Sequence, residues 1–270
     1  MTSKHGAITE QRVLAAFDAH VGWEHTQVRG NRVTRPIHDP AAIRAMMEFA
    51  EDWRPTIFIA GGDMVDCGCV SHWNANSPGA VEGFRLKDEL DALDDLIITP
   101  ITRLVKGRKV YLAGNHEAWI DQLLDRSPAL IGMISVADYL RLHERGWEVL
   151  SLGEIAKVNK CHFTHGESVG SGVYGAKRAI DMYGRNIILG HHHTYQTHIK
   201  ASAMDENDFH SAIMVPGLCR RNPRYGRNRP NAWLQGFLCQ EVHPSGYFSS
   251  QVHILVRGKF TAGGKLYGGK

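Results

Sequence analysis

The positions of apolar residues along the chain predict short buried strands separated by helices. Short apolar runs that end in glycine or a polar residue are typical of strands in a parallel sheet. Such runs cover residues 13–17, 56–60, 109–113, 147–150, 161–163 and 186–189. Apolar residues at helical spacing predict helices over 40–52, 81–98, 117–126, 135–145 and 175–184. Asp39 is the expected N-cap of the first helix.

Beyond residue 194 the pattern changes to alternation of apolar and polar residues. It predicts antiparallel strands near 195–203, 210–215, 235–242 and 247–256. We expect a polar loop, rich in Arg and His, from residue 20 to Pro40, and a partly mobile tail over 258–270, where Gly and Lys are frequent. With no repeat and no long linker, residues 1–270 predict one α/β domain, a sandwich of two sheets flanked by helices.

Composition places the chain among soluble globular proteins, with 43% hydrophobic and 22% charged residues. The net charge of +3 does not mark a nucleic-acid binder, so any basic surface must be local. No apolar run has the length of a membrane span, and the N-terminus lacks the apolar core of a signal peptide. Five cysteines without a CxxC pair favour reduced thiols, so we expect a cytoplasmic protein with no membrane association.

Residue types that bind metals follow five of the predicted strands. They are Asp18 and His20, Asp63 and Asp66, Asn115 and His116, His165, and His191 and His193. In open α/β sheets, ligands bind at the carboxyl ends of the strands, where these side chains would meet. Mixed imidazole and carboxylate ligands suit first-row divalent metals, and a pair of such metals can clamp a displacement at phosphorus.

Five short motifs occur in order along the chain. They are Asp-x-His at 18–20, GDxxD at 62–66, GNHE at 114–117, the single His165, and GHxH at 190–193. This order resembles that of the calcineurin-like metallophosphoesterases. The short chain and the segments 164–167 and 233–237 are similar to the stand-alone phage and bacterial members, which are related to the repair-nuclease branch. The resemblance implies a four-layer fold, two packed mixed sheets flanked by helices, with metals at the strand ends.

The resemblance also implies a ligand set for two metals. Asp18, His20, Asp63 and His193 would bind the first metal, and Asp63, Asn115, His165 and His191 the second, with Asp63 bridging. A hydroxide bridging the metals would be the nucleophile, because two cations lower the pKa of bound water. We expect two divalent ions, with manganese preferred over iron, zinc or nickel.

The remaining motif residues receive roles from the same resemblance. His116 would neutralise phosphoryl charge and donate a proton to the leaving oxygen, and Asn115 and His116 would contact the substrate. Asp66 would orient His116, with a turn-capping Asp as the alternative. His192, the variable residue of GHxH, is expected to point away from the metals.

Other patterns near these motifs have structural explanations. Cys67 and Cys69 fit small buried thiols better than metal ligands. Cys67 also stands where protein phosphatases carry an Arg that grips phosphate, which disfavours that activity. Residues 170–175 match GxGxxG but do not directly follow a strand, so a flexible active-site loop is a better interpretation than a dinucleotide site. No P-loop motif, GxxxxGK[ST], occurs.

An arginine-rich segment at 220–229 is the candidate substrate contact. Arg220, Arg221 and Arg224 would bind phosphate groups of nucleic acid, with Tyr225 or Trp233 available for base stacking. A solvated basic loop is the alternative interpretation. Arg29, Arg32 and Arg35 could add to the same basic surface. His72, Trp73 and Asn74 are candidates for the lining of the substrate cleft.

The sequence leaves several functions open. The leading hypothesis is a dinuclear metal-dependent phosphodiesterase, a nuclease that acts on DNA. A phosphomonoesterase or small-nucleotide phosphodiesterase is the enzymatic alternative, and a weakly active nucleic-acid-binding accessory protein is the alternative from another class. Each hypothesis predicts a phosphoester or nucleic-acid ligand, and none identifies a partner protein.

Overall fold

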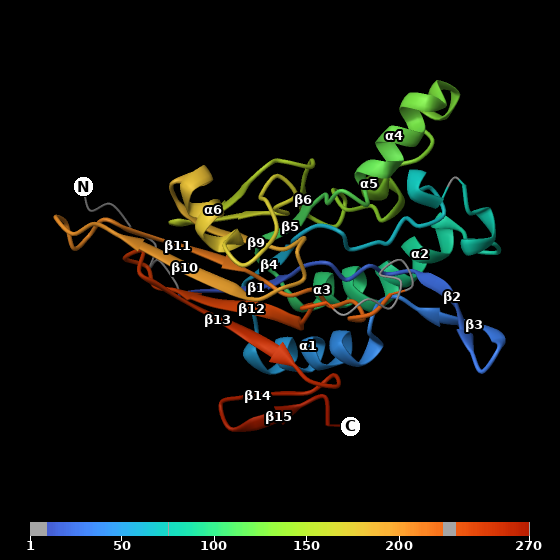
Figure 1. Cartoon of the computed structure of the whole chain (residues 1–270). Helices are drawn as coiled ribbons and strands as arrows, with labels where there is room; N and C mark the ends of the chain where they lie inside the picture. The colour runs from blue at the N-terminus through green and yellow to red at the C-terminus, as the bar shows by residue number, and fades with distance from the viewer. Residues whose placement is uncertain (1–9, 75, 224–230, 270) are drawn as a thin grey trace.

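The computed structural model describes residues 10–74, 76–223 and 231–269, and its centre is a sandwich of two mixed sheets (Figure 1). The larger sheet has the strand order β13-β12-β1-β4-β5-β6. Its strands are β1 (Gln11–Ala16), β4 (Ile57–Ala60), β5 (Lys109–Leu112), β6 (Trp147–Leu150), β12 (Gln235–Val242) and β13 (Phe248–Leu255). β1, β4, β5 and β6 run parallel, whereas β12 pairs antiparallel with both β1 and β13.

The smaller sheet has the strand order β10-β11-β9-β8-β7. Its strands are β7 (Ala156–Val158), β8 (Cys161–Thr164), β9 (Asn186–Leu189), β10 (Gln196–Ala201) and β11 (Phe209–Met214). β8, β9 and β11 run parallel, and the edge strands β7 and β10 are antiparallel to their neighbours. Val13 and Ile59 of the larger sheet share one buried cluster with Phe163 and Ile188 of the smaller sheet. Each strand predicted from the apolar pattern is present.

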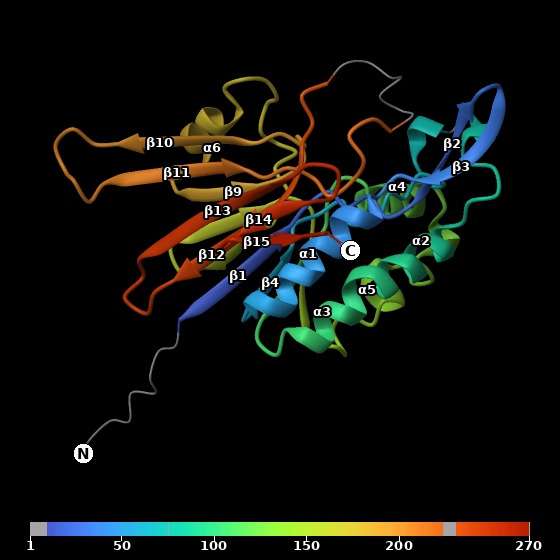
Figure 2. The ribbon, with the colours of Figure 1, turned by 90° about the horizontal axis from the view of Figure 1, so that it is seen from below.

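Helices cover the outer face of each sheet, so the molecule has four layers (Figure 2). The α-helices are α1 (Pro40–Trp53), α2 (Leu86–Leu93), α3 (Thr99–Leu104), α4 (Ala118–Arg126), α5 (Val136–Tyr139) and α6 (Gly175–Tyr183). Phe49 of α1 packs in the buried cluster that contains Phe58 of β4, and Ile180 of α6 packs in the cluster that contains Leu189 of β9. Asp39 caps α1 as predicted. The predicted fold class, an α/β sandwich of two mixed sheets flanked by helices, is confirmed.

Several segments differ from the sequence prediction. The expected polar loop after residue 20 contains a hairpin, β2 (Trp23–Val28) and β3 (Asn31–Pro36). Its strands have no continuous apolar face, and Val28 and Val33 are exposed, so the apolar pattern did not mark them. The helix predicted over 81–98 begins at Leu86 and continues into α3 through a π-helical turn, η3 (Asp94–Ile98). The helix predicted over 135–145 is confined to α5. Short 3₁₀ turns are η1 (His72–Asn74), η2 (Pro78–Ala80) and η4 (Pro128–Leu130).

The C-terminal residues form a second hairpin, β14 (Phe260–Ala262) and β15 (Lys265–Tyr267), where composition suggested a partly mobile tail. Phe260 and Tyr267 are buried, and their ring centroids lie 5.0 Å apart. Both rings contact Phe49, and the hairpin lies beneath α1 in Figure 1, on the side away from the sheets. Within the described residues, no helix is long and apolar enough to cross a membrane.

Candidate metal centre

The segments that follow five parallel strands of the two sheets converge at one edge of the sandwich. In chain order, β1, β4, β5, β8 and β9 lead to Asp18, Asp63, Asn115, His165 and His191. Backbone hydrogen bonds join neighbouring segments, since Asp18 N–H donates to Gly62 O at 3.0 Å and Gly190 N–H donates to His165 O at 3.0 Å. The carboxyl ends of both sheets therefore supply the candidate ligands, as the sequence predicted.

Backbone strain is concentrated at this edge. Asp18, His20, Asp63, His191 and His193 have φ values between 45° and 65°. Residues other than glycine rarely adopt this left-handed region, and each instance costs about 1–3 kcal/mol. Such conformations persist where the surrounding structure enforces them, and they cluster at functional sites.

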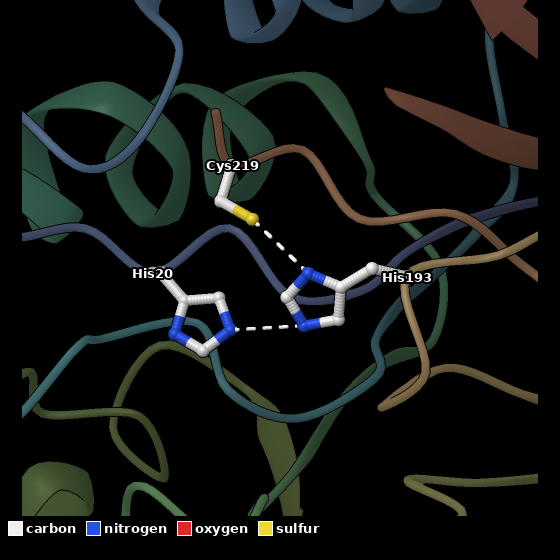
Figure 3. A group of neighbouring side chains, drawn as sticks. All are labelled: His20, His193 and Cys219. Carbon is white, nitrogen blue, oxygen red and sulfur yellow. Dashed lines mark hydrogen bonds between the residues drawn. The ribbon is translucent and has the colours of Figure 1, made fainter. Parts of the chain in front are cut away.

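One cluster of candidate ligands contains Asp18, His20 and His193. Figure 3 shows His20 and His193 with their Nε2 atoms facing each other, 3.3 Å apart. Asp18 Oδ1 lies 3.4 Å from His193 Nε2, and all three side chains are buried. Asp63 Oδ2 lies 3.8 Å from His20 Nε2 and reaches this cluster from the neighbouring strand.

The second cluster contains Asn115, His165 and His191. His165 Nε2 lies 3.0 Å from Asn115 Oδ1 and 3.2 Å from His191 Nδ1. Asp63 Oδ2 lies 3.3 Å from His165 Nε2, so the same carboxylate oxygen borders both clusters. His165 Nδ1 donates to Gly61 O at 3.1 Å, so Nε2 is the ring nitrogen that faces the cluster and would bind a metal.

The donor set fits divalent cations. Asp18 Oδ1 is buried and has no hydrogen-bond partner among the described residues. Burial by itself raises the pKa of Asp63, but the charges of His165 and His116 outweigh it and hold the pKa well below its usual value. A buried, ionised carboxylate among imidazole nitrogens is an environment that a bound cation stabilises.

His116 lies beside the two clusters, and its partner is Asp66, through the main chain rather than through the carboxylate that the sequence suggested. Its Nδ1 donates to the backbone oxygen of Asp66 at 2.6 Å. The Asp66 carboxylate oxygen Oδ1 is 3.8 Å from His116 Nδ1 and 3.4 Å from His20 Nδ1. The main chain of Asp66 therefore orients His116, and its side chain faces His20 more closely. The His116 ring also packs on Trp119, with centroids 3.8 Å apart.

Two residues of the site were not assigned roles from the sequence. Glu117 is buried, and its carboxylate accepts hydrogen bonds from the backbone N–H groups of Asp63 and Gly114 at 3.0 Å and 2.9 Å. Cys219 Sγ lies 3.3 Å from His193 Nδ1, at the ring nitrogen opposite the one that faces His20 (Figure 3). Glu117 is the fourth residue of the GNHE motif, so the sequence held a signal for it, whereas Cys219 belongs to no motif.

The remaining residues near the motifs lie outside the clusters. Cys67 is buried and Cys69 is half-buried, and the Cys67 N–H donates to Glu89 at 2.9 Å. His192 Nε2 donates to Val169 O at 2.9 Å, so this ring turns toward the 165–174 loop, as expected. The GxGxxG stretch ends where α6 begins and does not directly follow β8.

The arginine-rich segment is described only in part. Arg220 Nε donates to Pro36 O at 2.9 Å, and Arg221 Nε donates to Trp233 O at 2.5 Å. Arg224, Tyr225, Arg227 and Arg229 lie outside the described residues. The Trp233 ring lies 4.0 Å from the His193 ring, which places this segment next to the first cluster.

Comparisons with known proteins found structural similarity only. No protein-family model and no curated protein matches the chain. A NAD nucleotidase of Haemophilus influenzae is 12% identical with a TM-score of 0.40, and the alignment covers 92% of this chain and 56% of that chain. A phosphoesterase of E. coli is 13% identical with a TM-score of 0.39, covering 89% and 98%. A dimetal phosphatase of Danio rerio is 12% identical with a TM-score of 0.40, covering 86% and 94%.

The chain therefore spans 56% of the length of the nucleotidase that it resembles.

Proposed function

We propose that this protein is a phosphoester hydrolase that uses two divalent metal ions. The position of Asp63 supports this function most strongly, because its Oδ2 lies 3.8 Å from His20 Nε2 of one cluster and 3.3 Å from His165 Nε2 of the other. A shared carboxylate offsets the repulsion between two neighbouring cations. Asp18, His20 and His193 would hold one ion, and Asn115, His165 and His191 the other. With the ordered motifs, this supports a place among the calcineurin-like metallophosphoesterases.

The chain's own residues would position the substrate and move a proton. Two bound cations would polarise the phosphoryl group and activate water. His116 is held through its Nδ1–H, so its Nε2 is the atom that can face the substrate and protonate the leaving oxygen. Its main-chain N–H donates to Asp63 Oδ1 at 2.8 Å, which ties the proton donor to the shared carboxylate.

As the substrate, we propose nucleic acid, with DNA first and a phosphodiester as the bond cleaved. The support is the placement of basic segments at the site, since Trp233 contacts His193 and Arg35 of β3 donates to Asn222 O at 3.0 Å. Arginine contacts to phosphates would make binding depend on salt. Manganese as the ion, a cytoplasmic location and a relationship to the repair nucleases belong to the same proposal.

A small-nucleotide phosphodiesterase or phosphomonoesterase is the second candidate. A cavity of about 720 Å³ beside His116 favours it, because several aromatic side chains line the wall and would suit a single nucleoside.

The test is an activity panel with Mn²⁺, comparing single- and double-stranded DNA with simple monoester and diester reporters. Asp63→Asn is expected to lower turnover by roughly a thousandfold, because several kcal/mol of charge stabilisation would be lost with the metals. Asp121→Asn, an exposed carboxylate on α4, is the matched control and should leave turnover unchanged.

The outcomes separate the hypotheses. Strong monoester turnover with intact DNA would remove the nuclease. DNA binding that Asp63→Asn leaves intact, without any turnover, would identify the accessory protein. A chain that neither binds two equivalents of metal nor hydrolyses any phosphoester would overturn the proposed function.

A further inference from the structure

We propose that the cavity beside the metal centre binds one nucleoside, as the leaving group of the phosphoester. This inference rests on the proposed hydrolase function, because it takes His116 as the residue that faces the leaving oxygen. Of the two substrate candidates, it supports the small nucleotide over DNA. The cavity has a volume of about 720 Å³ and lies between the β2–β3 hairpin, the 67–84 segment and α4. This volume is typical of sites that enclose drug-sized ligands.

The cavity is continuous with the metal centre. Asn115 and His116 line it, and both also contact the ligand clusters, through His165 and Asp63 respectively. Asp66 lines the same wall. A substituent of phosphorus on the His116 side would therefore extend into this space.

Aromatic side chains form much of the cavity wall. They are Trp23, Trp73, Phe84 and Trp119. Trp73 lies at the mouth with 74% of its surface exposed, so it is not a core residue and its ring is available to a ligand. Phe84 is held by stacking on His25, with centroids 4.4 Å apart. Rigid, partly exposed rings are the platforms on which nucleobases stack in nucleotide-binding proteins.

The charges of the wall favour a single nucleoside over a longer strand. None of the described residues that line the cavity is Lys or Arg. The charged side chains of the wall are acidic, and Glu24 pairs with Arg35 at 2.7 Å while Glu89 accepts the Cys67 N–H. Burial raises the pKa of Glu89 well above its usual value, which favours its neutral form. Among the described residues that line the cavity, a second phosphate would meet no cationic side chain, whereas a neutral base and sugar need none.

Two phosphonates would test this subsite, the analogues of AMP and of ribose 5-phosphate in which CH₂ replaces the ester oxygen and prevents hydrolysis. We expect titration calorimetry of the manganese-loaded chain to show that the adenine-bearing analogue binds at least about tenfold more tightly than the ribose analogue. Base stacking supplies a free energy of this size. Trp73→Ala should remove most of that difference, and Trp73→Phe should retain part of it. The ribose analogue should bind Trp73→Ala as it binds the unmodified chain.

Tyr247→Ala is the matched control, because this ring is 79% exposed and lies on the turn between β12 and β13. Equal affinities for the two analogues would overturn the nucleoside subsite while leaving the hydrolase standing. An adenine-dependent gain that survives both Trp73→Ala and Phe84→Ala would also overturn it. Efficient cleavage of closed circular DNA would overturn the restriction to one nucleoside. Failure to bind metal or either analogue, without turnover of any ester, would instead count against the proposed function.

Discussion

At the residue scale, Glu117 is the structural support of the shared carboxylate. Its two oxygens accept hydrogen bonds from the main chain of Asp63 and Gly114, and from the Tyr111 hydroxyl at 2.8 Å. These bonds fix the segment in which Asp63 has a φ of 50°. Glu117 is therefore a positioning residue that joins the ends of β4 and β5.

We expect Glu117→Gln to lower the free energy of unfolding by about 3 kcal/mol, because the new NH₂ group would face N–H donors and leave some of them buried and unpaired. Tyr111→Phe removes one hydrogen bond and should cost about 1 kcal/mol. Urea unfolding of both variants measures the two values. Weaker manganese binding by Glu117→Gln should accompany the loss, and equal destabilisation by the two variants would contradict the assigned role.

The candidate ligands could be predicted as a set because their residue types recur after successive strands. The hydrogen bonds and contacts that hold these side chains could not be predicted from the sequence. The sequence does not show that the Asp66 main chain holds His116, or that Cys219 lies 3.3 Å from His193. Such contacts depend on how the loops close after each strand, and they have no periodic signal in the sequence.

At the element scale, the junction between α2 and α3 is held by a charged pair. Asp94 begins the π-helical turn η3 and accepts two hydrogen bonds from the Arg145 guanidinium. Thr99 Oγ1 donates to the same carboxylate at 2.7 Å. The bond from Arg145 is the main reason that the pKa of Asp94 lies below its usual value.

Because of this pair, we expect the stability of the folded protein to depend on pH. Because the pKa of Asp94 is lower in the folded chain than in the unfolded chain, its contribution is complete above the unfolded pKa and is lost as pH falls through the folded pKa. Asp94→Asn should destabilise the protein by about 1 kcal/mol at neutral pH. Denaturant unfolding at a series of pH values should show the difference from the unmodified chain shrinking toward zero in acid. A difference that stays constant down to pH 3 would refute this assignment.

The elements differ in how clearly the sequence marks them. Strands such as β4 and β9 are buried runs of apolar residues, so the apolar pattern located them. The β2–β3 hairpin has few apolar residues, and the β14–β15 hairpin has strands of only three residues that are anchored on Phe49 by Phe260 and Tyr267. Strands that are mostly polar or only three residues long do not produce a recognisable period, so the apolar pattern predicts neither hairpin.

At the scale of the whole molecule, we expect metal removal to reduce both activity and stability. A ligand that binds only the folded state stabilises it by about 2.7 kcal/mol at a concentration 100 times its dissociation constant. Dialysis against a chelator should therefore abolish hydrolysis and lower the thermal unfolding midpoint, and added Mn²⁺ should restore both. Asp63→Asn should show little of this shift. A midpoint that is the same with chelator and with Mn²⁺ would be incompatible with a metal centre in the fold.

The place of β1 in the larger sheet has a consequence for biosynthesis. β1 leads to Asp18 and lies between β4 and β12, and its Ala15 is paired with Leu238. A growing polypeptide thus carries one open edge of this strand until β12 has been synthesised. We expect nascent chains to be prone to aggregation on the ribosome until β12 has paired with β1.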